Sequence, residues 1–274
     1  MEEMIEDVRI CVIGAGKMGG ALIHGLISNK MITPKSLFAI DMIKDRCNQL
    51  HMKYGIECST NVTSFVDGSD IIIIAVKPKD IENLAKNIKK LLTVKKLVIT
   101  LAAGVSTQFL SRLIGDDVPI IRAMPNIAVL VNEGMIALAR GANSTDEQMN
   151  LTEKIFNTIG KVAIVEEKHM DTVTGLSGSG PAYVYSIIEA MSNGAIKDGL
   201  DEELALQLSA QTTLGAAKMI LETGKQPSEL IEMVVTPGGT TEQGLLQLEK
   251  NKVKQALIEA VIKASEKSRK MIRT

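Results

Sequence analysis

The feature that most constrains this fold is a glycine turn near the start of the sequence. An apolar run over residues 10–13 leads into Gly14, Gly16 and Gly19, which have the spacing G-x-G-x-x-G, and an amphipathic segment follows. The order strand, glycine turn, helix is typical of dinucleotide-binding folds. The glycines let the backbone approach a pyrophosphate, and the helix N-terminus supplies N–H groups to hold it. A glycine turn that binds no ligand is the alternative.

One acidic residue supports the dinucleotide prediction. Residues 36–40 form the next expected strand, and Asp41 closes it about 20 residues after the glycine turn. A carboxylate there can bind the ribose 2′-hydroxyl of NAD, whereas it would repel the 2′-phosphate of NADP. Lys44 and Arg46 follow closely and could offset that repulsion, or they could belong to a solvated helix face. We therefore expect NADH or NADPH as cofactor, with a slight preference for NADH.

Strands and helices alternate through residues 1–165. Four consecutive isoleucines, residues 71–74, predict a strand that is buried on both faces, as in a parallel sheet covered by helices. Residues 75–78 (AVKP) then fall at the C-terminal edge of this strand, where open α/β sheets bind ligands. We predict a Rossmann-type N-terminal domain with a mostly parallel sheet over residues 1–165.

The pattern changes after residue 165, where only helical segments follow. We predict an all-α C-terminal domain over residues 166–274. The abundant apolar surface of these helices favours a homodimer, by packing or by exchange of helices, and a self-contained bundle is the alternative.

The turn over residues 237–241 (PGGTT) is the most informative feature of this second half. Two glycines before a helix start leave N–H groups unobstructed, which suits a small anion such as a carboxylate. A plain helix–helix turn capped by Thr241 is the alternative.

Composition argues against several classes of function. The net charge is −1, no basic stripe is visible, and the chain has four Phe, three Tyr and no Trp, so nucleic-acid binding is not expected. The longest apolar run, residues 71–76, is too short to span a membrane, and the acidic start resembles no targeting peptide. Three cysteines without a CxxC pair predict no metal site and no disulfide framework, and they favour a reducing, cytoplasmic location.

The chain offers no obvious general acid or base. None of His24, His51 and His169 stands beside a carboxylate at a strand end. Reduction of a carbonyl normally needs such a group, so its absence favours a substrate that is already protonated, such as an iminium. Hydroxyacid dehydrogenases of similar two-domain architecture place a lysine after a glycine turn like residues 176–181, but residues 182–184 here are AYV.

Taken together, the motifs resemble those of the pyrroline-5-carboxylate reductases. The residues that carry the resemblance span nearly the whole chain: VIGAGKMGGAL (12–22), AVKP (75–78), LAAGVS (101–106), IRAMPN (121–126), TGLSGSGPAYVY (174–185), AIKDGL (195–200) and TPGGTT (236–241). The sequence departs from the family pattern at Lys79, Ile127 and Val235, all at the edges of motifs. An NAD-dependent hydroxyacid dehydrogenase and a non-catalytic NAD-binding protein are the alternatives.

The resemblance implies reduction of (S)-1-pyrroline-5-carboxylate, a cyclic imine, to L-proline with NAD(P)H, the last step of proline biosynthesis. It also implies a dimer through the helical domain, with larger assemblies of dimers in some members. Thr241 would be catalytic, and Gly239, Thr240 and Thr241 would bind the substrate, with Glu167 as a further candidate. Together with Asp41, the expected cofactor contacts are Gly14, Ala15, Gly16, Lys17, Met18, Gly19, Asn61, Ala75, Val76, Lys77, Pro78, Ala103 and Asn126.

Overall fold

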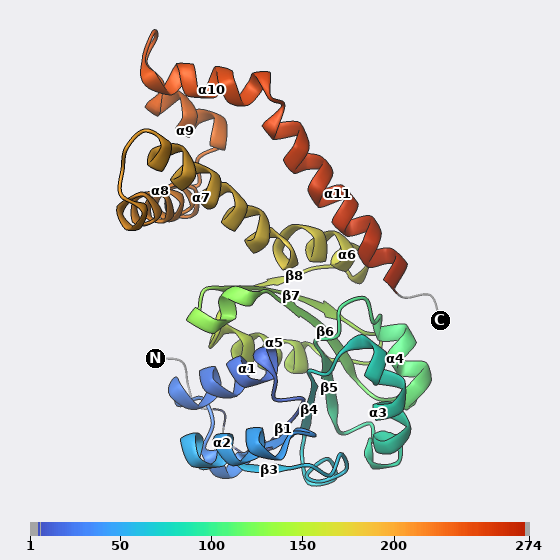
Figure 1. Ribbon diagram of the computed structural model, residues 1–274. Helices are drawn as coiled ribbons and strands as arrows, with labels where there is room; N and C mark the ends of the chain where they lie inside the picture. The colour runs from blue at the N-terminus through green and yellow to red at the C-terminus, as the bar shows by residue number, and fades with distance from the viewer. Residues whose placement is uncertain (1–4, 6, 272–274) are drawn as a thin grey trace. The chain divides into compact units, whose positions relative to one another are not determined.

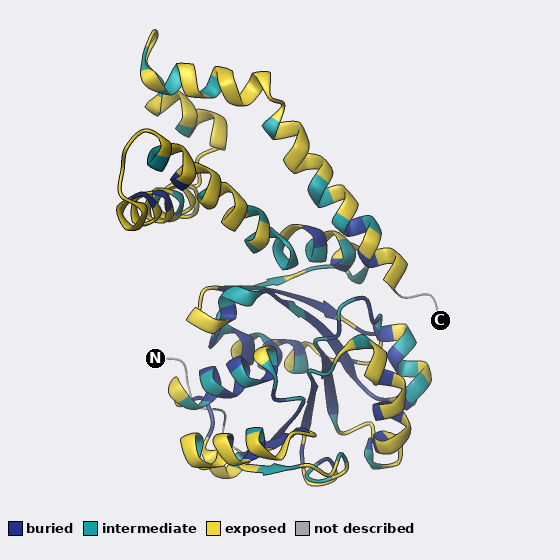
Figure 2. Cartoon of the chain, viewed as in Figure 1, coloured by how far each residue is buried: buried dark blue, intermediate teal, exposed yellow. Residues whose placement is uncertain are grey.

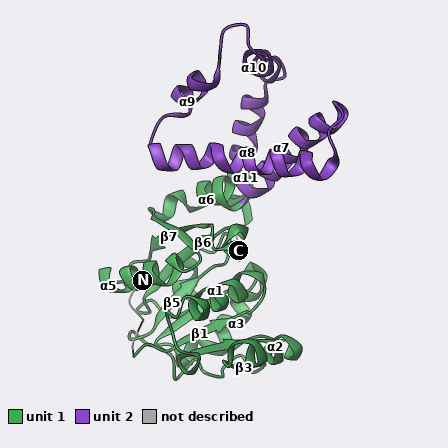
Figure 3. Cartoon of the chain, turned by 90° about the vertical axis from the view of Figure 1, so that its left-hand side faces the viewer, with its two compact units in different colours: residues 1–178, 264–274 green, residues 179–263 purple. Residues whose placement is uncertain are grey.

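The computed structural model describes residue 5 and residues 7–271, which form two compact units (Figure 3). The first unit comprises residues 1–178 and 264–274, and the second comprises residues 179–263. The division therefore falls at residue 178 and not at the predicted residue 165. The reason is that Met170 is fully buried against Ala137 and Ala139, which belong to the sheet of the first unit.

The first unit is one sheet of eight strands in the order β3-β2-β1-β4-β5-β6-β7-β8 (Figure 1). Every neighbouring pair is parallel except β6 and β7, so the predicted Rossmann-type, mostly parallel sheet is confirmed. The strands are β1 (Ile10–Ile13), β2 (Leu37–Ile40), β3 (Glu57–Ser59), β4 (Ile71–Ile74), β5 (Leu97–Thr100), β6 (Ile120–Pro125), β7 (Gly134–Arg140) and β8 (Gly160–Ile164). The helices are α1 (Lys17–Ser28), α2 (Lys44–Tyr54), α3 (Ile81–Ile88), α4 (Thr107–Ile114), α5 (Asp146–Asn157) and α6 (Met170–Val173).

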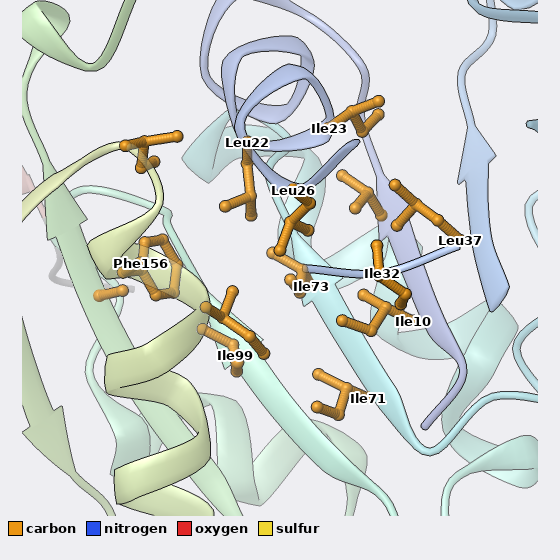
Figure 4. Close-up of a cluster of buried hydrophobic side chains, with 14 of the residues drawn as sticks. Ile10, Leu22, Ile23, Leu26, Ile32, Leu37, Ile71, Ile73, Ile99 and Phe156 are labelled. Carbon is orange, nitrogen blue, oxygen red and sulfur yellow. The ribbon is translucent and has the colours of Figure 1, made fainter. Parts of the chain in front are cut away.

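The four isoleucines of β4 show how helices cover both faces of this sheet. Ile71 and Ile73 pack on the face that carries α1 and α5, as the cluster in Figure 4 shows. Ile72 and Ile74 point to the opposite face, where they pack with α3 and α4. Successive strand residues alternate between faces, so a strand covered on both sides must be apolar throughout.

Two local features of the first unit differ from expectation. β3 was not predicted, because its three residues are polar or half-buried and it exists only through parallel pairing with β2. Cys47 and Cys58 are joined in a disulfide, so the expectation that the chain lacks one is wrong. The cysteines consequently give no support for a reducing compartment, and the cytoplasmic location stays a prediction.

The second unit is helical, as predicted. Its helices are α7 (Gly180–Lys197), α8 (Glu202–Thr223), α9 (Pro227–Val234), α10 (Thr240–Lys250) and α11 (Val253–Met271), the last part of which belongs to the first unit. Asp201 caps α8 by accepting hydrogen bonds from two N–H groups, and Gly224 ends α8 in the left-handed conformation (φ 66°). None of the helices over the described residues combines the length and apolar content needed to cross a membrane.

Candidate active site

The parallel strands bring the predicted cofactor residues to one edge of the sheet. β1 to β6 all run in the same direction, so their carboxyl ends share that edge. The predicted contacts follow directly: the glycine turn after β1, Asp41 after β2, Asn61 after β3, residues 75–78 after β4, Ala103 after β5 and Asn126 after β6. Open α/β sheets bind ligands at this edge.

Gly14 and Gly19 are required by the packing of the turn itself. Gly14 has a left-handed φ of 98°, and a Cβ there would lie 2.9 Å from the carbonyl atoms of Ala75. A Cβ at Gly19 would lie 2.0 Å from the carbonyl oxygen of Gly14. Gly14 therefore lets the turn lie close to the end of β4, and Gly19 lets α1 pack closely against the turn.

Gly16 has a different role, because no atom of the described residues would crowd a side chain there. A Cβ at this position would meet no atom within 4 Å. Gly16 is also the N-cap residue of α1, and no side chain caps the helix there. The first N–H groups of a helix lack partners within the helix, so this end of α1 is open to an anion supplied from outside. Next to Gly16, Lys17 is exposed and Met18 is half-buried against the core.

The side chain of Asp41 connects the end of β2 to the glycine turn and to α2. Its buried carboxylate accepts hydrogen bonds from the N–H groups of Ala15 and Ile43, both at 2.9 Å. It also pairs with the guanidinium of Arg46, at 2.7 Å, and the Arg46 side chain is 37% exposed. The carboxylate thus links β2 to the glycine turn and to α2, and its charge is balanced.

Two apolar residues beside Asp41 were not recognised in the sequence. Met42 is 93% exposed and Ile43 is 50% exposed, immediately after the strand end. Exposed apolar side chains at this edge are available to contact a flat apolar group of a ligand. The signal that could have found them is their place between an acidic strand end and the start of a helix.

The remaining cofactor candidates lie at the same edge in different settings. Asn61 is exposed, and its side-chain oxygen accepts hydrogen bonds from Thr63. Asn126 is buried, and its side-chain oxygen accepts from the N–H groups of Ala128 and Met135, both at 3.2 Å. Asn126 therefore shapes the end of β6.

A pocket of about 570 Å³ opens beside the end of β4. Its lining residues are Lys77, Pro78, Lys79, Glu82, Val105, Phe109 and Met271. Two of these, Lys77 and Pro78, are predicted cofactor contacts. Val105 follows Ala103 in the loop after β5.

Glu167 belongs to a cluster of charged groups inside the first unit. Its carboxylate accepts hydrogen bonds from the N–H (2.7 Å) and the hydroxyl of Thr107, at the start of α4. It also lies 3.6 Å from the guanidinium of Arg122, which is 4% exposed and reaches Asp171 at 3.9 Å. Asp171 in turn accepts from Ser268 at 2.6 Å. These contacts give Glu167 a structural role, and substrate binding by Glu167 stays a prediction.

The predicted substrate residues lie in the second unit, at the start of α10. Gly238 has a left-handed φ of 72°, and a Cβ at Gly239 would lie 2.3 Å from the hydroxyl oxygen of Thr236. Gly239 is the N-cap residue, and no side chain caps the helix. Thr240 is exposed and Thr241 is half-buried. Both glycines are therefore needed to form the turn, and the first N–H groups of α10 lack helical partners.

No lysine replaces the missing general acid at the second glycine turn. The π-helical turn Thr174–Gly178 is followed by α7, and residues 182–184 lie in the first turns of α7. The hydroxyl of Tyr183 donates to the carbonyl of Ala260 at 3.5 Å, within the second unit. This arrangement gives no support to the hydroxyacid dehydrogenase alternative.

A glycine turn at the carboxyl edge of a parallel sheet, followed by an uncapped helix, is the arrangement of a dinucleotide-binding Rossmann protein, here joined to a separate helical unit. Residues 9–104 match a family model described as NADP oxidoreductase, coenzyme F420-dependent. Residues 167–271 match a family model described as pyrroline-5-carboxylate reductase dimerisation.

Individual relatives identify the family. The chain is 44% identical over 267 residues to the pyrroline-5-carboxylate reductase of Methanosarcina acetivorans, covering 97% of this chain and 99% of that one. It is 38% identical over 265 residues to the Escherichia coli enzyme, covering 97% and 98%. The chain therefore belongs to the pyrroline-5-carboxylate reductase family, and the resemblance predicted from its motifs is confirmed.

Solved structures agree with this assignment. A pyrroline-5-carboxylate reductase from Coxiella burnetii superposes with a TM-score of 0.91 at 34% identity, over 97% of this chain and 99% of that one. The Plasmodium falciparum pyrroline carboxylate reductase, solved with NADP bound, gives a TM-score of 0.89 at 33% identity, over 98% and 99%.

Proposed function

We propose that this chain reduces 1-pyrroline-5-carboxylate to proline with NAD(P)H, the last step of proline biosynthesis. The observation that carries the proposal is the uncapped start of α10, where Gly238 and Gly239 prepare an anion-binding turn in the unit that lacks the dinucleotide motif. The substrate has a carboxylate to bind there and a ring nitrogen that is already protonated as an iminium, so the lack of a general acid is no obstacle.

The dinucleotide belongs to residues 1–165 in this proposal. The residues present fit it: the N-terminus of α1 is uncapped, no atom crowds Gly16, and the apolar pair after Asp41 is exposed. The N–H groups at the end of the glycine turn and the start of α1 hold the pyrophosphate, and residues 75–78, Ala103 and Asn126 shape the remainder of the edge. When bound, the reduced nicotinamide supplies the hydride.

The substrate belongs to residues 166–274. The N–H groups of Thr240 and Thr241 hold its carboxylate at the start of α10. The Thr241 hydroxyl donates a hydrogen bond to the ring nitrogen, whose electron pair develops as the C=N bond is reduced. Orientation of the imine supplies most of the rate in this scheme.

Thr241→Ala tests the catalytic role of the hydroxyl. We expect kcat to fall about 100-fold, as when one donor is removed from a developing charge, while direct titration gives an unchanged Kd for NAD(P)H. Thr241→Ser, which keeps the hydroxyl, is the matched control and should retain most of the activity. Unchanged kinetics in Thr241→Ala would exclude the role.

NADH is the preferred cofactor in this proposal, although by a small margin. Asp41 favours a ribose hydroxyl, since its Oδ1 receives only the Ile43 N–H among the hydrogen bonds of the described residues. Arg46 balances the charge of Asp41 and so reduces the repulsion of a 2′-phosphate. Comparison of kcat/KM for NADH and NADPH decides the preference, and a strong advantage for NADPH would reverse it.

In this proposal two copies of the chain form a homodimer through the helical domain, residues 166–274. Any larger assembly consists of such dimers. The support is the apolar surface that the second unit leaves uncovered in the single chain, together with the dimerisation match over residues 167–271.

A further inference from the structure

The Cys47–Cys58 disulfide lies close to the ribose end of the proposed cofactor site. Cys47 is in α2 and Cys58 is in β3, with their Cα atoms 5.0 Å apart. The sulfur of Cys47 lies 3.7 Å from the carbonyl oxygen of Asp41, the residue that ends β2. The disulfide therefore fastens α2 to the edge strand of the sheet, beside Asp41.

The disulfide is the covalent one among a few contacts that hold α2, beside the hydrogen bonds of Tyr54 to His24 and of His51 to the carbonyl oxygen of Ile56, both at 3.1 Å. Of its eleven residues only Cys47 and Leu50 are buried. β3, to which the disulfide ties the helix, is itself a three-residue edge strand. The covalent link therefore adds to the few contacts that hold this helix in place.

The first turn of α2 carries the residue that balances Asp41. Arg46 directly precedes Cys47, and its guanidinium lies 2.7 Å from the Asp41 carboxylate. The same carboxylate accepts the N–H of Ala15 in the glycine turn. A shift of α2 would therefore separate Arg46 from Asp41 and leave an unbalanced negative charge at the ribose end.

The disulfide is open to small molecules. A pocket of about 230 Å³ is lined by both cysteines together with Asn48, His51, Glu57 and Phe65. The third cysteine, Cys11, is fully buried in β1, where burial raises the pKa of its thiol to about 12. Cys47 is buried and Cys58 is half-buried, so a small thiol reaches the pair through this pocket at Cys58, whereas Cys11 is shielded and stays protonated.

We propose that Cys47–Cys58 is a reversible thiol–disulfide pair that sets cofactor discrimination through Arg46. A thiolate of a small dithiol attacks one sulfur and forms a mixed disulfide, and its second thiol then releases the protein thiol. The protein pair gains two electrons and two protons, and the dithiol becomes a cyclic disulfide. Once reduced, α2 loosens, Arg46 leaves Asp41, and binding of a 2′-phosphate weakens while binding of a 2′-hydroxyl is preserved. This inference rests on the proposed function, which puts the ribose at Asp41.

The first experiment counts thiols in the purified full-length protein under denaturing conditions. We expect one reactive thiol before treatment with dithiothreitol, from Cys11, and three afterwards. Three thiols in protein purified and kept without reductant would overturn the proposal.

The second experiment measures the Kd of NADPH and of NADH by fluorescence titration, before and after dithiothreitol. We expect the NADPH Kd to rise about fivefold on reduction, as expected for loss of a partly exposed charge pair, and the NADH Kd to change less than about twofold. An unchanged NADPH Kd in protein shown to hold three thiols would overturn the proposal.

Variants separate the disulfide from other effects of the reductant. The double variant Cys47→Ser/Cys58→Ser should bind NADPH as reduced protein does and ignore dithiothreitol, while Cys11→Ala should respond as the unaltered chain does. Arg46→Ala keeps the disulfide and should bind NADPH weakly in both states. A response to dithiothreitol that persists in Arg46→Ala would overturn the role of this residue. These are binding measurements, so a failure to reduce pyrroline-5-carboxylate would count against the proposed function alone.

Discussion

The two units of this chain bury their apolar residues in opposite ways. In the first unit, strands β1, β2, β4 and β5 are buried at every position, and both faces of the sheet are covered (Figure 2). In the second unit, the 22-residue helix α8 buries only Ala205 and Ser209. The first unit therefore completes a hydrophobic core by itself, whereas the second exposes the residues that would build one.

The exposed residues of α8 show what the second unit lacks. Seven large apolar side chains are between 40% and 83% exposed: Leu204, Leu206, Leu208, Leu214, Met219, Ile220 and Leu221. They do not lie on one stripe, so a single neighbouring helix cannot cover them. Monomeric soluble proteins rarely expose apolar surface on this scale. A second copy of the chain is the occupant that the dimerisation match favours.

The largest effect is expected from a charge placed on the exposed apolar surface of α8. If such a charge left the dimer intact, the contrast between the two units would be wrong. Leu214→Asp places a carboxylate in the buried, apolar interface of the proposed dimer. An unpaired buried charge costs about 3–5 kcal/mol. We expect dimer affinity to fall by about 100-fold or more, with loss of activity, as measured by light scattering and NAD(P)H oxidation. Val94→Asp is the matched control, since Val94 is 60% exposed in the first unit and its substitution should change neither property. An active Leu214→Asp dimer would disprove the interpretation.

A smaller effect should follow from a cavity in the first unit. Ile73 is fully buried in β4, and Ile73→Ala should lower the free energy of unfolding by about 2–5 kcal/mol. Because this core lies within one chain, the loss should not depend on protein concentration in urea titrations. Leu214→Ala, by comparison, should destabilise more strongly as the protein is diluted, since its loss is coupled to association. If the loss of stability depended on protein concentration equally in Ile73→Ala and Leu214→Ala, the proposed difference between a core within one chain and a core shared between chains would be wrong.

The smallest effect on folding is expected at Gly16, where an added side chain would contact only the bound cofactor. Gly16→Ala should change the free energy of unfolding by less than about 1 kcal/mol, since its Cβ meets no atom within 4 Å. We expect the Kd of NAD(P)H to rise about tenfold, because the methyl group enters the space assigned to the pyrophosphate. Gly20→Ala, one position beyond the motif, is the control and should keep the affinity. If both variants bind equally well, the pyrophosphate lies elsewhere.

The sequence predicted the elements whose signal is local. The strand before the glycine turn and the buried isoleucine strand were both found as expected, because apolarity and the flanking residues alone decide them. The carboxyl-edge residues came together because parallel strands place them there without further information.

What the sequence did not predict depends on how neighbouring elements pack, which the local pattern of residues does not encode. β3 has no apolar alternation and forms only because β2 pairs with it. The Cys47–Cys58 bond requires α2 to fold back on the sheet, which their spacing of eleven residues does not reveal. The sequence left open whether Arg46 offsets the negative charge at Asp41 or belongs to a solvated helix face. The contact of 2.7 Å between its guanidinium and the Asp41 carboxylate shows the first.

Helix α11 has a consequence for the order in which the chain can be completed during synthesis. Its last part belongs to the first unit, where Ser268 is buried and donates to Asp171. The second unit is thus inserted into the first, and the closing segment of the Rossmann unit leaves the ribosome only after residues 179–263 have done so. The first unit is synthesised first but gains its last contacts only when the chain is finished. A nascent chain stopped at residue 178 lacks Ser268 and therefore one side of the cluster around Asp171.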